Sequence, residues 1–335
     1  MADLDKLRKK LELLGSGVSI NKQGIMQVKE RLEKLDIPEG VVKAIRIDNV
    51  RRLSSKASSL TELAIGKGVR YVDLEGCSNL KGLVLSEEID ADKIKLPSNL
   101  QEIVLDFLSG PTGIVGTGGD YKANWNLHSI DGTLYMYGLI RGKFRTLDLN
   151  IKNLGSNSHK MIGDHICGDK LILRGNKHLD LTYVLSKSEF KEIELVGIES
   201  IQYGLIGSAL TYSIVYGNDL KYITIDLSGS RNYITINFDF SRLPNLKEFS
   251  IKNIEMLSSK PVKDVIMSDN IIKFCALRDV SGTLRLSRNL REEDLKAWVD
   301  RLHTYSIQEL QITEAQYEIY HDKLDSLSVN IVRRA

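Results

Sequence analysis

Residues 69–89 read VRYVDLEGCSNLKGLVLSEEI and contain one spacing of apolar residues twice. In the first copy Val69, Val72 and Leu74 stand at positions i, i+3 and i+5, and the second copy follows eleven residues later. Polar residues alternate with Val72 and Leu74, which is the period of a strand with one buried and one exposed face. Residues 76–79 between the copies, GCSN, are typical of a turn. The stretch therefore predicts two short strands joined by a compact corner.

The same triple, apolar-x-x-apolar-x-apolar, recurs along most of the chain. It begins at Val42, Val69, Leu80, Leu100, Phe144, Phe190, Leu220, Leu246, Ile307 and Leu324. Longer matches connect LPSNLQEIVL (96–105) with LPNLKEFSI (243–251). Successive predicted strands start about 20–30 residues apart, which is the range of leucine-rich repeats.

This pattern resembles the leucine-rich repeat L-x-x-L-x-L-x-x-C/N-x-x-L over roughly residues 42–330. It is most similar to an irregular bacterial-type repeat, and it departs from the family in lacking a regular ladder of asparagines. The resemblance implies an α/β fold, a right-handed solenoid whose turns add strands to one continuous parallel β-sheet. Another β-solenoid or a two-domain β-rich protein is the alternative.

The two ends of the chain have a different pattern from the body. Apolar residues at helical spacing predict amphipathic helices over 3–14 and 22–36, so we expect residues 1–40 to form an N-terminal helical cap on the solenoid. An oligomerising coiled coil is the alternative for these helices.

Residues 289–335 predict a C-terminal α/β cap. A helix capped by Asn289 would present one apolar face, and Thr313-x-x-Gln316 resembles a capping box that opens a second helix. Strands are expected at 307–312 and 324–332, and a parallel pairing is possible for them. The apolar face of the first helix consists of Leu295, Trp298, Val299 and Leu302.

Residues 41–288 form the predicted body of the solenoid, with one interruption. The segment 108–128 is rich in glycine and predicts a loop excursion. A phosphate-binding loop is disfavoured because no Gly-Lys-Ser/Thr follows and no helix clearly starts there.

Composition narrows the classes of function. The chain has 335 residues, 42% hydrophobic and 27% charged, and a net charge of +2, which are typical of a soluble globular protein and give no sign of a nucleic-acid or membrane partner. No apolar run is long enough for a transmembrane helix, and the first residues lack a signal-peptide core. Three widely separated cysteines predict reduced thiols rather than disulfides, so we expect a cytoplasmic protein.

Candidate reactive residues have simpler structural interpretations. His159, Asp164, His165, Cys167 and His178 cluster in the sequence, but their spacing does not suit a zinc site. The segment 167–169, Cys-Gly-Asp, matches the Cys-x-Asp of a bacterial leucine-rich-repeat ubiquitin-ligase family, although the helical domain that carries that motif is not visible in this chain. The acidic pairs 87–88 and 292–293 are adjacent surface acids rather than a glycosidase pair. We therefore predict no catalytic residue, no cofactor and no metal.

The exposed face of the expected sheet is the remaining candidate site. If the last two residues of each triple point inward, the residues between and around them share the opposite, concave face. Acidic side chains outnumber basic ones on that face, which would favour a basic protein partner. The predicted partner-binding residues are Tyr71, Asp73, Glu75, Glu102, Asp106, Asp148, Glu192, Glu194, Tyr222 and Asp226.

The sequence thus favours a non-enzymatic protein–protein interaction module. The first alternative is a structural component of a larger assembly, such as a phage or secretion particle, that uses the terminal caps as contact surfaces. An enzyme that acts on carbohydrate is the second alternative.

Overall fold

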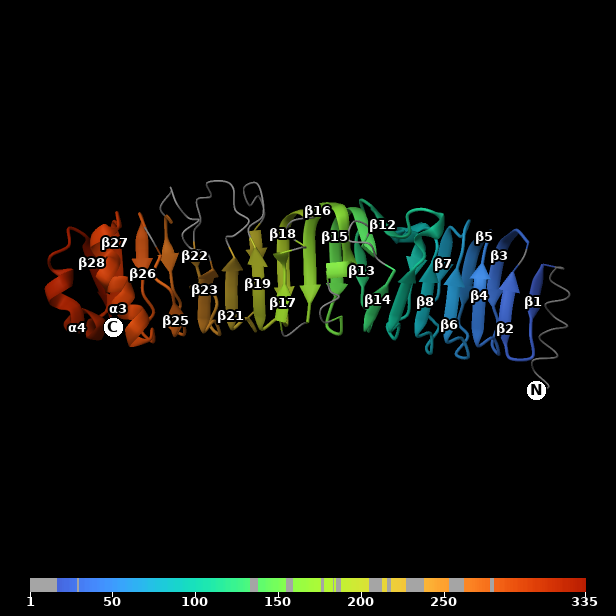
Figure 1. Cartoon of the computed structure of the whole chain (residues 1–335), viewed down its shortest axis with the longest axis horizontal. Helices are drawn as coiled ribbons and strands as arrows, with labels where there is room; N and C mark the ends of the chain where they lie inside the picture. The colour runs from blue at the N-terminus through green and yellow to red at the C-terminus, as the bar shows by residue number, and fades with distance from the viewer. Residues whose placement is uncertain are drawn as a thin grey trace. The chain divides into compact units, whose positions relative to one another are not determined.

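The chain consists mainly of short strands in several mostly parallel sheets, with few helices (Figure 1). The computed structural model describes residues 17–28, 30–132, 138–154, 159–175, 178–182, 184, 188–204, 213–215, 218–226, 238–252, 262–277 and 280–335. The chain divides into two compact units. Unit 1 contains Met1–Asn176 and Lys187–Ile193, and unit 2 contains Lys177–Ser186 and Glu194–Ala335.

Unit 1 is built from three sheets. Sheet 1 has the order β1 (Val18–Ile20), β2 (Ile25–Val28), β4 (Lys43–Ile47), β6 (Glu62–Ile65), β8 (Gly82–Leu85), β11 (Glu102–Leu105) and β14 (Ser129–Asp131). Sheet 2 has the order β10 (Ile94–Lys95), β7 (Tyr71–Asp73), β5 (Val50–Ser55) and β3 (Leu32–Ile37). Sheet 3 contains β9 (Glu88–Asp90), β12 (Gly113–Thr117), β15 (Ile140–Asn150), β16 (Ile162–Arg174) and β18 (Ser188–Val196), and β13 (Tyr121–Ala123) also pairs with β15. Short 3₁₀ helices lie at η1 (Ala91–Lys93) and η2 (Phe107–Ser109).

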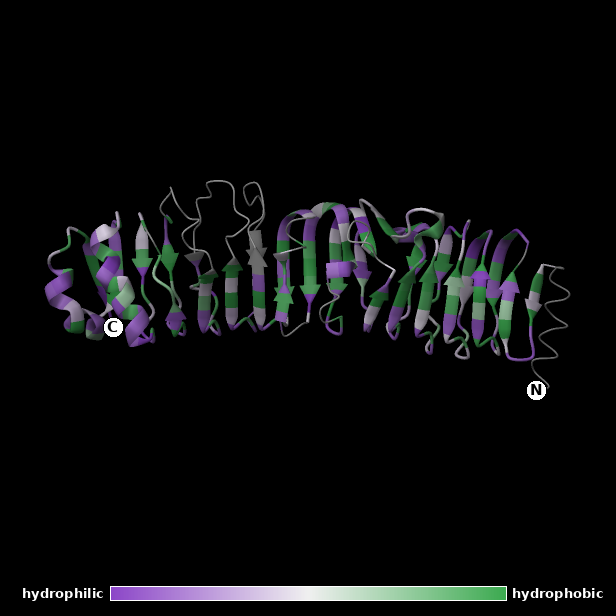
Figure 2. Cartoon of the chain, viewed as in Figure 1, coloured by the Kyte–Doolittle hydropathy of each residue, from purple (hydrophilic) through white to green (hydrophobic). Residues whose placement is uncertain are grey.

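A spacing of twenty residues relates the three strands β6, β8 and β11 of sheet 1. In sheet 1, Leu63 lies opposite Leu83, and Leu83 lies opposite Ile103, so equivalent residues repeat every twenty positions. All three side chains are at most 2% exposed, and they form a column of aliphatic side chains inside the unit. Figure 2 shows the resulting alternation of hydrophobic and hydrophilic residues along the strands. The period-2 pattern therefore fixes which face of each strand is buried.

Asparagine side chains hold several corners between successive turns of the chain. The Asn79 amide donates to the Ser58 carbonyl at 2.7 Å, and the Asn99 amide donates to the Leu80 carbonyl at 2.9 Å. In unit 2 the Asn245 amide reaches the Asn218 carbonyl at 2.8 Å in the same way. These corner asparagines form a partial ladder that bonds one turn to the previous one. Each of these asparagines precedes a buried leucine, so an Asn-Leu pair marks such a corner in the sequence.

Unit 2 contains two more sheets and the helices. Sheet 4 has the order β17 (His178–Asp180), β19 (Ser200–Gly204), β21 (Tyr222–Asp226), β23 (Glu248–Lys252) and β25 (Lys273–Phe274). Sheet 5 has the order β22 (Phe238–Asp239), β24 (Val265–Ile266), β26 (Thr283–Arg285), β27 (Glu309–Thr313) and β28 (Asn330–Arg334). The remaining elements are β20 (Ser213–Val215), α3 (Glu292–Arg301), η5 (Leu302–Thr304) and α4 (Glu314–Leu324).

The core of unit 2 includes a column of aromatic side chains. The rings of Phe240 and Phe249 lie 4.9 Å apart, those of Phe249 and Phe274 4.5 Å, and those of Phe274 and Trp298 5.5 Å. Trp298 is fully buried, and its indole nitrogen donates to the Phe274 carbonyl at 2.9 Å. This bond ties α3 to the strand beneath it, because a buried indole N–H needs an acceptor.

The predicted order of elements at the C-terminal end is confirmed. The predicted apolar face of α3 is buried, although the helix begins after Arg291 rather than at Asn289. Thr313 and Gln316 form the expected capping box at α4. Strands β27 and β28 flank α4 and pair in parallel.

The prediction of a helix over 22–36 is wrong. Within residues 17–37, β1 and β2 form the antiparallel pair of sheet 1, and β3 begins sheet 2. The predicted helix over 3–14 lies outside the described residues. Of the four apolar residues at helical spacing, Ile25, Val28, Leu32 and Leu35, only Val28 and Leu35 are buried, so the spacing does not mark one face of a helix.

The glycine-rich segment 108–128 is not a loop excursion. It contains β12 and β13, both of which pair in parallel with β15. Gly116 lies where a Cβ would come within 2.4 Å of the Lys143 carbonyl and the Phe144 ring. Glycine there permits close approach of two backbones within a sheet, so a high glycine content does not indicate a flexible segment here.

The expectation of one continuous sheet is also wrong. The strands fall into five sheets, and described pairings are parallel apart from that of β1 with β2. The shared feature that was correctly predicted is the mixed α/β composition with parallel strands.

Candidate binding surface

The outer face of sheet 1 carries two columns of side chains. Because side chains alternate along each strand, the residues on either side of buried Leu63, Leu83 and Ile103 point outward. The first column consists of Glu62, Gly82 and Glu102, and the second consists of Ala64, Val84 and Val104. The second column is half-buried and entirely apolar.

Gly82 interrupts the first column and leaves a hollow in the sheet surface. A Cβ built at Gly82 would meet one atom within 4 Å, the Cγ of Glu62 at 3.7 Å, which is an ordinary contact distance. The backbone at Gly82 therefore does not require glycine, and the missing side chain simply opens space between Glu62 and Glu102.

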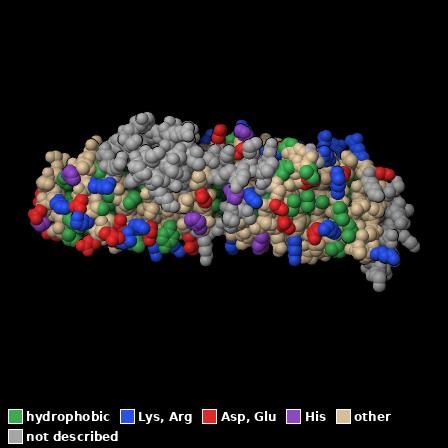
Figure 3. Space-filling view, in the orientation of Figure 1, with side chains coloured by type: hydrophobic (Ala, Val, Ile, Leu, Met, Phe, Trp, Pro, Cys, Tyr) green, Lys and Arg blue, Asp and Glu red, His purple; other side chains and the backbone are tan. Residues whose placement is uncertain are grey.

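The hollow, which we call the Gly82 hollow, has a volume of about 400 Å³. Figure 3 shows hydrophobic side chains among charged ones over the part of unit 1 that contains β4, β6 and β8. Besides backbone and inward residues of the same strands, its floor and rim contain Lys43, Ile45, Glu62, Ala64, Lys81, Gly82, Val84, Gln101, Glu102 and Val104.

A bulge in β4 adds an exposed apolar side chain to one side of the hollow. Ala44 pairs with Leu63 and Ile47 with Ile65, so two residues of β4 oppose one residue of β6. The extra residue places Arg46 at a φ of 49° and turns Ile45 outward, where it is 37% exposed. Of the triple that starts at Val42, the last two residues, Ile45 and Ile47, were expected to point inward. This prediction is wrong for Ile45, because the bulge shifts the alternation, whereas Ile47 is buried.

The rim of the hollow carries charges of both signs. Lys43 and Glu62 form an ion pair across β4 and β6, with 44% and 55% of their side chains exposed. An exposed pair of this kind contributes little to stability, about 0–1 kcal/mol, so both side chains can rearrange to meet a ligand at small cost. Lys81 and Glu102 add one further charge of each sign. The rim is therefore amphoteric rather than acidic.

The predicted partner-binding residues do not share one face. Tyr71 and Asp73 lie on sheet 2, with Glu75 just beyond, while Glu102 lies on sheet 1 and Asp106 follows it. The others lie on sheets 3 and 4: Asp148 on β15, Glu192 and Glu194 on β18, and Tyr222 and Asp226 on β21. The prediction of a single acidic concave face is thus wrong. Glu102 is the member of the set that borders the Gly82 hollow.

Several of the predicted residues already have internal partners. Asp148 accepts from Arg174 at 2.6 Å, and Glu192 pairs with Lys170 at 2.8 Å. The ring of Tyr71 lies 5.1 Å from the guanidinium of Arg52. Basic side chains on neighbouring turns therefore neutralise much of the negative charge that the sequence predicted for the concave face.

Of the candidate reactive residues, Asp164, His165 and Cys167 lie on β16, and His178 begins β17. Asp169 of the Cys-Gly-Asp segment pairs with Lys191 at 2.6 Å, and the Nδ1 atom of His178 lies 3.0 Å from the Ser200 hydroxyl. Burial raises the pKa of the Cys77 and Cys275 thiols, which disfavours their reactive thiolate forms. Within the described residues, no group of three or more His, Cys, Asp or Glu side chains is arranged to hold a metal ion.

Helices offer no membrane anchor in the part of the chain that is described, since none combines sufficient length with sufficient apolar character to cross a bilayer.

Sequence reasoning missed Gly82 although a signal for it was present. Aligning TELAI (61–65), KGLVL (81–85) and QEIVL (101–105) places Gly82 in a column otherwise occupied by glutamate. A glycine at an outward strand position weakens a strand, so its presence between two well-formed strands indicates either close backbone approach or an open site. The 3.7 Å contact shows that close approach is not the reason.

The chain was compared with protein-family models, with curated proteins and with solved structures, and none of the three comparisons found a match. No relative therefore suggests a ligand, a partner or an activity for this chain.

Proposed function

We propose that the chain is a non-enzymatic protein–protein interaction module, and that the Gly82 hollow on sheet 1 receives an apolar side chain from an extended segment of a partner protein. The observation that carries the proposal is the open position at Gly82. A side chain would be tolerated there at 3.7 Å from its nearest neighbour, yet the position is left empty above an apolar column.

The lining supports an apolar side chain as the occupant. Ala64, Val84 and Val104 supply the floor, and Ile45 supplies an exposed apolar wall. Covering these atoms removes apolar surface from water, which contributes about 25 cal/mol for each Å² buried. A volume of about 400 Å³ lies at the lower end of the range for ligand sites and suits one or two large side chains.

The rim supports a protein segment rather than an isolated apolar molecule. Lys43, Lys81, Glu62 and Glu102 surround the apolar floor with donors and acceptors of both signs. Interfaces between proteins commonly combine an apolar centre with a polar rim of this kind. A peptide with one bulky apolar residue between charged residues of both signs would satisfy both parts of the hollow.

We also propose that the stacked turns form a parallel β-solenoid, supported by the register of twenty residues in sheet 1. That these turns are leucine-rich repeats remains a prediction from the sequence. The three free cysteines are consistent with work in a reducing compartment such as the cytoplasm.

Selection of displayed random peptides on the purified full chain tests the proposal. We expect selected peptides to share a bulky apolar residue flanked by charges, and to lose binding by about tenfold or more when Gly82→Val places a branched side chain inside the hollow, since burial of one bulky side chain contributes about 1.5–3 kcal/mol. Gly119→Val is the matched control, because it adds the same side chain in unit 1 where a Cβ meets nothing within 4 Å.

Two results would contradict the proposal. Peptides that bind the Gly82→Val chain as tightly as the parent chain would show that the hollow is not the site. Failure to select any peptide class that distinguishes the two chains would remove a protein segment as the occupant.

A further inference from the structure

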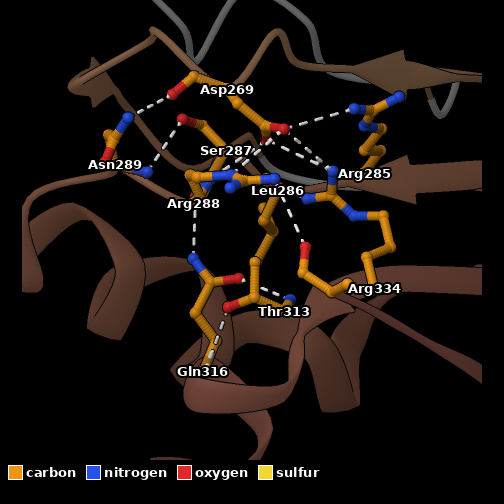
Figure 4. Close-up of polar contacts among 10 residues, drawn as sticks. Asp269, Arg285, Leu286, Ser287, Arg288, Asn289, Thr313, Gln316 and Arg334 are labelled. Atoms are coloured by element: carbon orange, nitrogen blue, oxygen red, sulfur yellow. Dashed lines mark hydrogen bonds and ion pairs between the residues drawn. The ribbon is translucent and has the colours of Figure 1, made fainter.

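Three arginines in unit 2 converge on one carboxylate, as Figure 4 shows. Asp269 lies in the corner between β24 and β25, Arg285 lies at the end of β26, Arg288 follows it, and Arg334 lies at the end of β28. The Oδ1 atom of Asp269 lies 3.2 Å from Nη1 of Arg334. Its Oδ2 atom lies 3.3 Å from Nε of Arg288 and 3.5 Å from Nη2 of Arg285.

The carboxylate does not saturate the three guanidinium groups. The distances of 3.2–3.5 Å exceed the roughly 2.7–2.9 Å of a strong charge-assisted hydrogen bond. The Nε atoms of Arg285 and Arg334 are buried and have no hydrogen-bond partner among the residues that the structure describes. Burial, together with the charges of Arg285 and Arg288, lowers the pKa of Arg334 despite the nearby Asp269.

Neighbouring carboxylates do not neutralise the excess positive charge of the three arginines. Asp239 is close enough to Arg285 to feel its charge, but Arg242 acts on the same carboxyl group. These six side chains carry four positive charges (Arg242, Arg285, Arg288 and Arg334) and two negative ones, and Arg288 also donates through Nη2 to the Ala335 oxygen at 3.3 Å. Arg333, the next residue along β28, is engaged elsewhere by Glu314 at 3.0 Å.

Hydrogen bonds to the backbone hold the cluster in place. The second terminal nitrogen of Arg334 donates to the Leu286 carbonyl, and the Arg288 backbone N–H donates to Asp269 at 3.3 Å. The Gln316 amide, fixed by the capping box of α4, donates to the Ser287 carbonyl at 2.7 Å. The corner that presents the arginines is therefore built before any ligand arrives, which favours tight binding.

We propose that this arginine cluster binds a tetrahedral oxyanion with a charge near −2, namely phosphate or the phosphate group of a monoester. Such an anion is opposite in charge to the three guanidinium groups and supplies the additional acceptors that the single carboxylate lacks. Ligand can approach from solvent, since the side chains of Arg288 and Arg285 are 52% and 30% exposed.

Titration calorimetry on the full chain tests this site, with inorganic phosphate and phenyl phosphate as probes at constant ionic strength. We expect Arg285→Gln and Arg288→Gln each to weaken binding by about tenfold or more, because each removes hydrogen bonds to a charged group. Arg333→Gln is the matched control from the same strand and should leave binding unchanged. Tighter binding of phenyl phosphate would indicate a phosphate ester as the ligand, and equal or weaker binding would indicate the free anion.

Asp269→Asn distinguishes a ligand site from a structural cluster. It removes the negative charge that competes with the ligand, so phosphate should bind more tightly and should raise the melting temperature of this variant more than that of the parent chain. If the cluster were purely structural, Asp269→Asn would lower the melting temperature, and phosphate would not raise it. The proposal is overturned if the parent chain binds neither probe, if Arg333→Gln weakens binding as much as Arg288→Gln, or if Asp269→Asn binds phosphate less tightly.

Discussion

Replacing Gly82 with valine should stabilise unit 1 while it obstructs the Gly82 hollow. Gly82 lies in the middle of sheet 1, between β6 and β11, and a Cβ there would make one contact, at 3.7 Å. A stabilising change that removes binding is unusual, because most substitutions at structural positions weaken the fold. At this one residue, peptide affinity and the stability of unit 1 should therefore change in opposite directions.

The expected magnitude follows from two effects that act in the same direction. Glycine in a strand costs about 0.5–1 kcal/mol relative to alanine, mainly through the entropy of the unfolded chain. Valine is also among the residues best suited to strands, and the whole strand-propensity scale spans about 1 kcal/mol. Since the nearest atom is at a normal contact distance, no steric term opposes them, and we expect a gain of about 1 kcal/mol.

Urea unfolding followed by tryptophan fluorescence measures the change. The chain has two tryptophans, Trp125 in unit 1 and Trp298 in unit 2. Comparing Gly82 and Gly82→Val chains in a Trp298→Phe background leaves Trp125 as the reporter of unit 1. Trp125 is 4% exposed, so its emission should shift on unfolding.

A contrasting glycine tests the same reasoning. At Gly116 a Cβ would lie 2.4 Å from both the Lys143 carbonyl and the Phe144 ring, so Gly116→Ala should destabilise the unit by about 1–3 kcal/mol. A lowered or unchanged unfolding midpoint for Gly82→Val would refute the interpretation of Gly82 as an open position.

Three further changes test the fold. Trp298→Phe should cost about 2–4 kcal/mol, because it leaves the buried Phe274 carbonyl without the donor now at 2.9 Å and also leaves a small cavity; urea unfolding followed by circular dichroism measures this. Asn99→Ala should lower the free energy of unfolding by about 1 kcal/mol, because it removes the corner bond to the Leu80 carbonyl. Relative to the parent chain, amide exchange should become faster in β11 and change less in β2, which would show that the destabilisation is local to that corner. Burial raises the pKa of Asp269, but the Arg288 N–H and the charge of Arg334 outweigh it, so the net pKa is lowered. The stability that this carboxylate contributes is therefore present above its unfolded pKa of about 3.9 and is lost as the pH falls through the lower folded value; melting temperatures from pH 2 to 7 should depend less on pH in Asp269→Asn.

The C-terminal elements could be predicted because their signals are local. The apolar face of α3 follows from a spacing of three and four residues around Leu295 and Trp298, and the capping box at Thr313 involves residues three apart. Neither signal depends on where the rest of the chain lies. The boundary of α3 was less accurate, since Arg291 rather than Asn289 precedes its first turn.

The membership of strands in sheets could not be predicted because it depends on the corners. The period of two correctly identified Val72 and Leu83 as buried, but it does not say that Val72 belongs to sheet 2 and Leu83 to sheet 1. The chain changes direction at the corner 76–79, where backbone bonds from Cys77 to Leu74 and from Leu80 to Cys77 close the turn. Assigning all triples to one sheet ignored this change of direction and produced an acidic face that does not exist.

The candidate site depends on the same register that the corners maintain. Glu62, Gly82 and Glu102 form one column because the turns that connect β6, β8 and β11 have twenty residues between equivalent positions. Deleting one residue between the corner and β8 would exchange the inward and outward faces of β8 and place Leu83 where Gly82 now lies. The amide of Asn79 opposes such a slip by bonding to the previous turn at 2.7 Å. The corner asparagines thus contribute to the hollow without touching it, and their loss should weaken peptide binding only to the extent that it loosens the register of sheet 1.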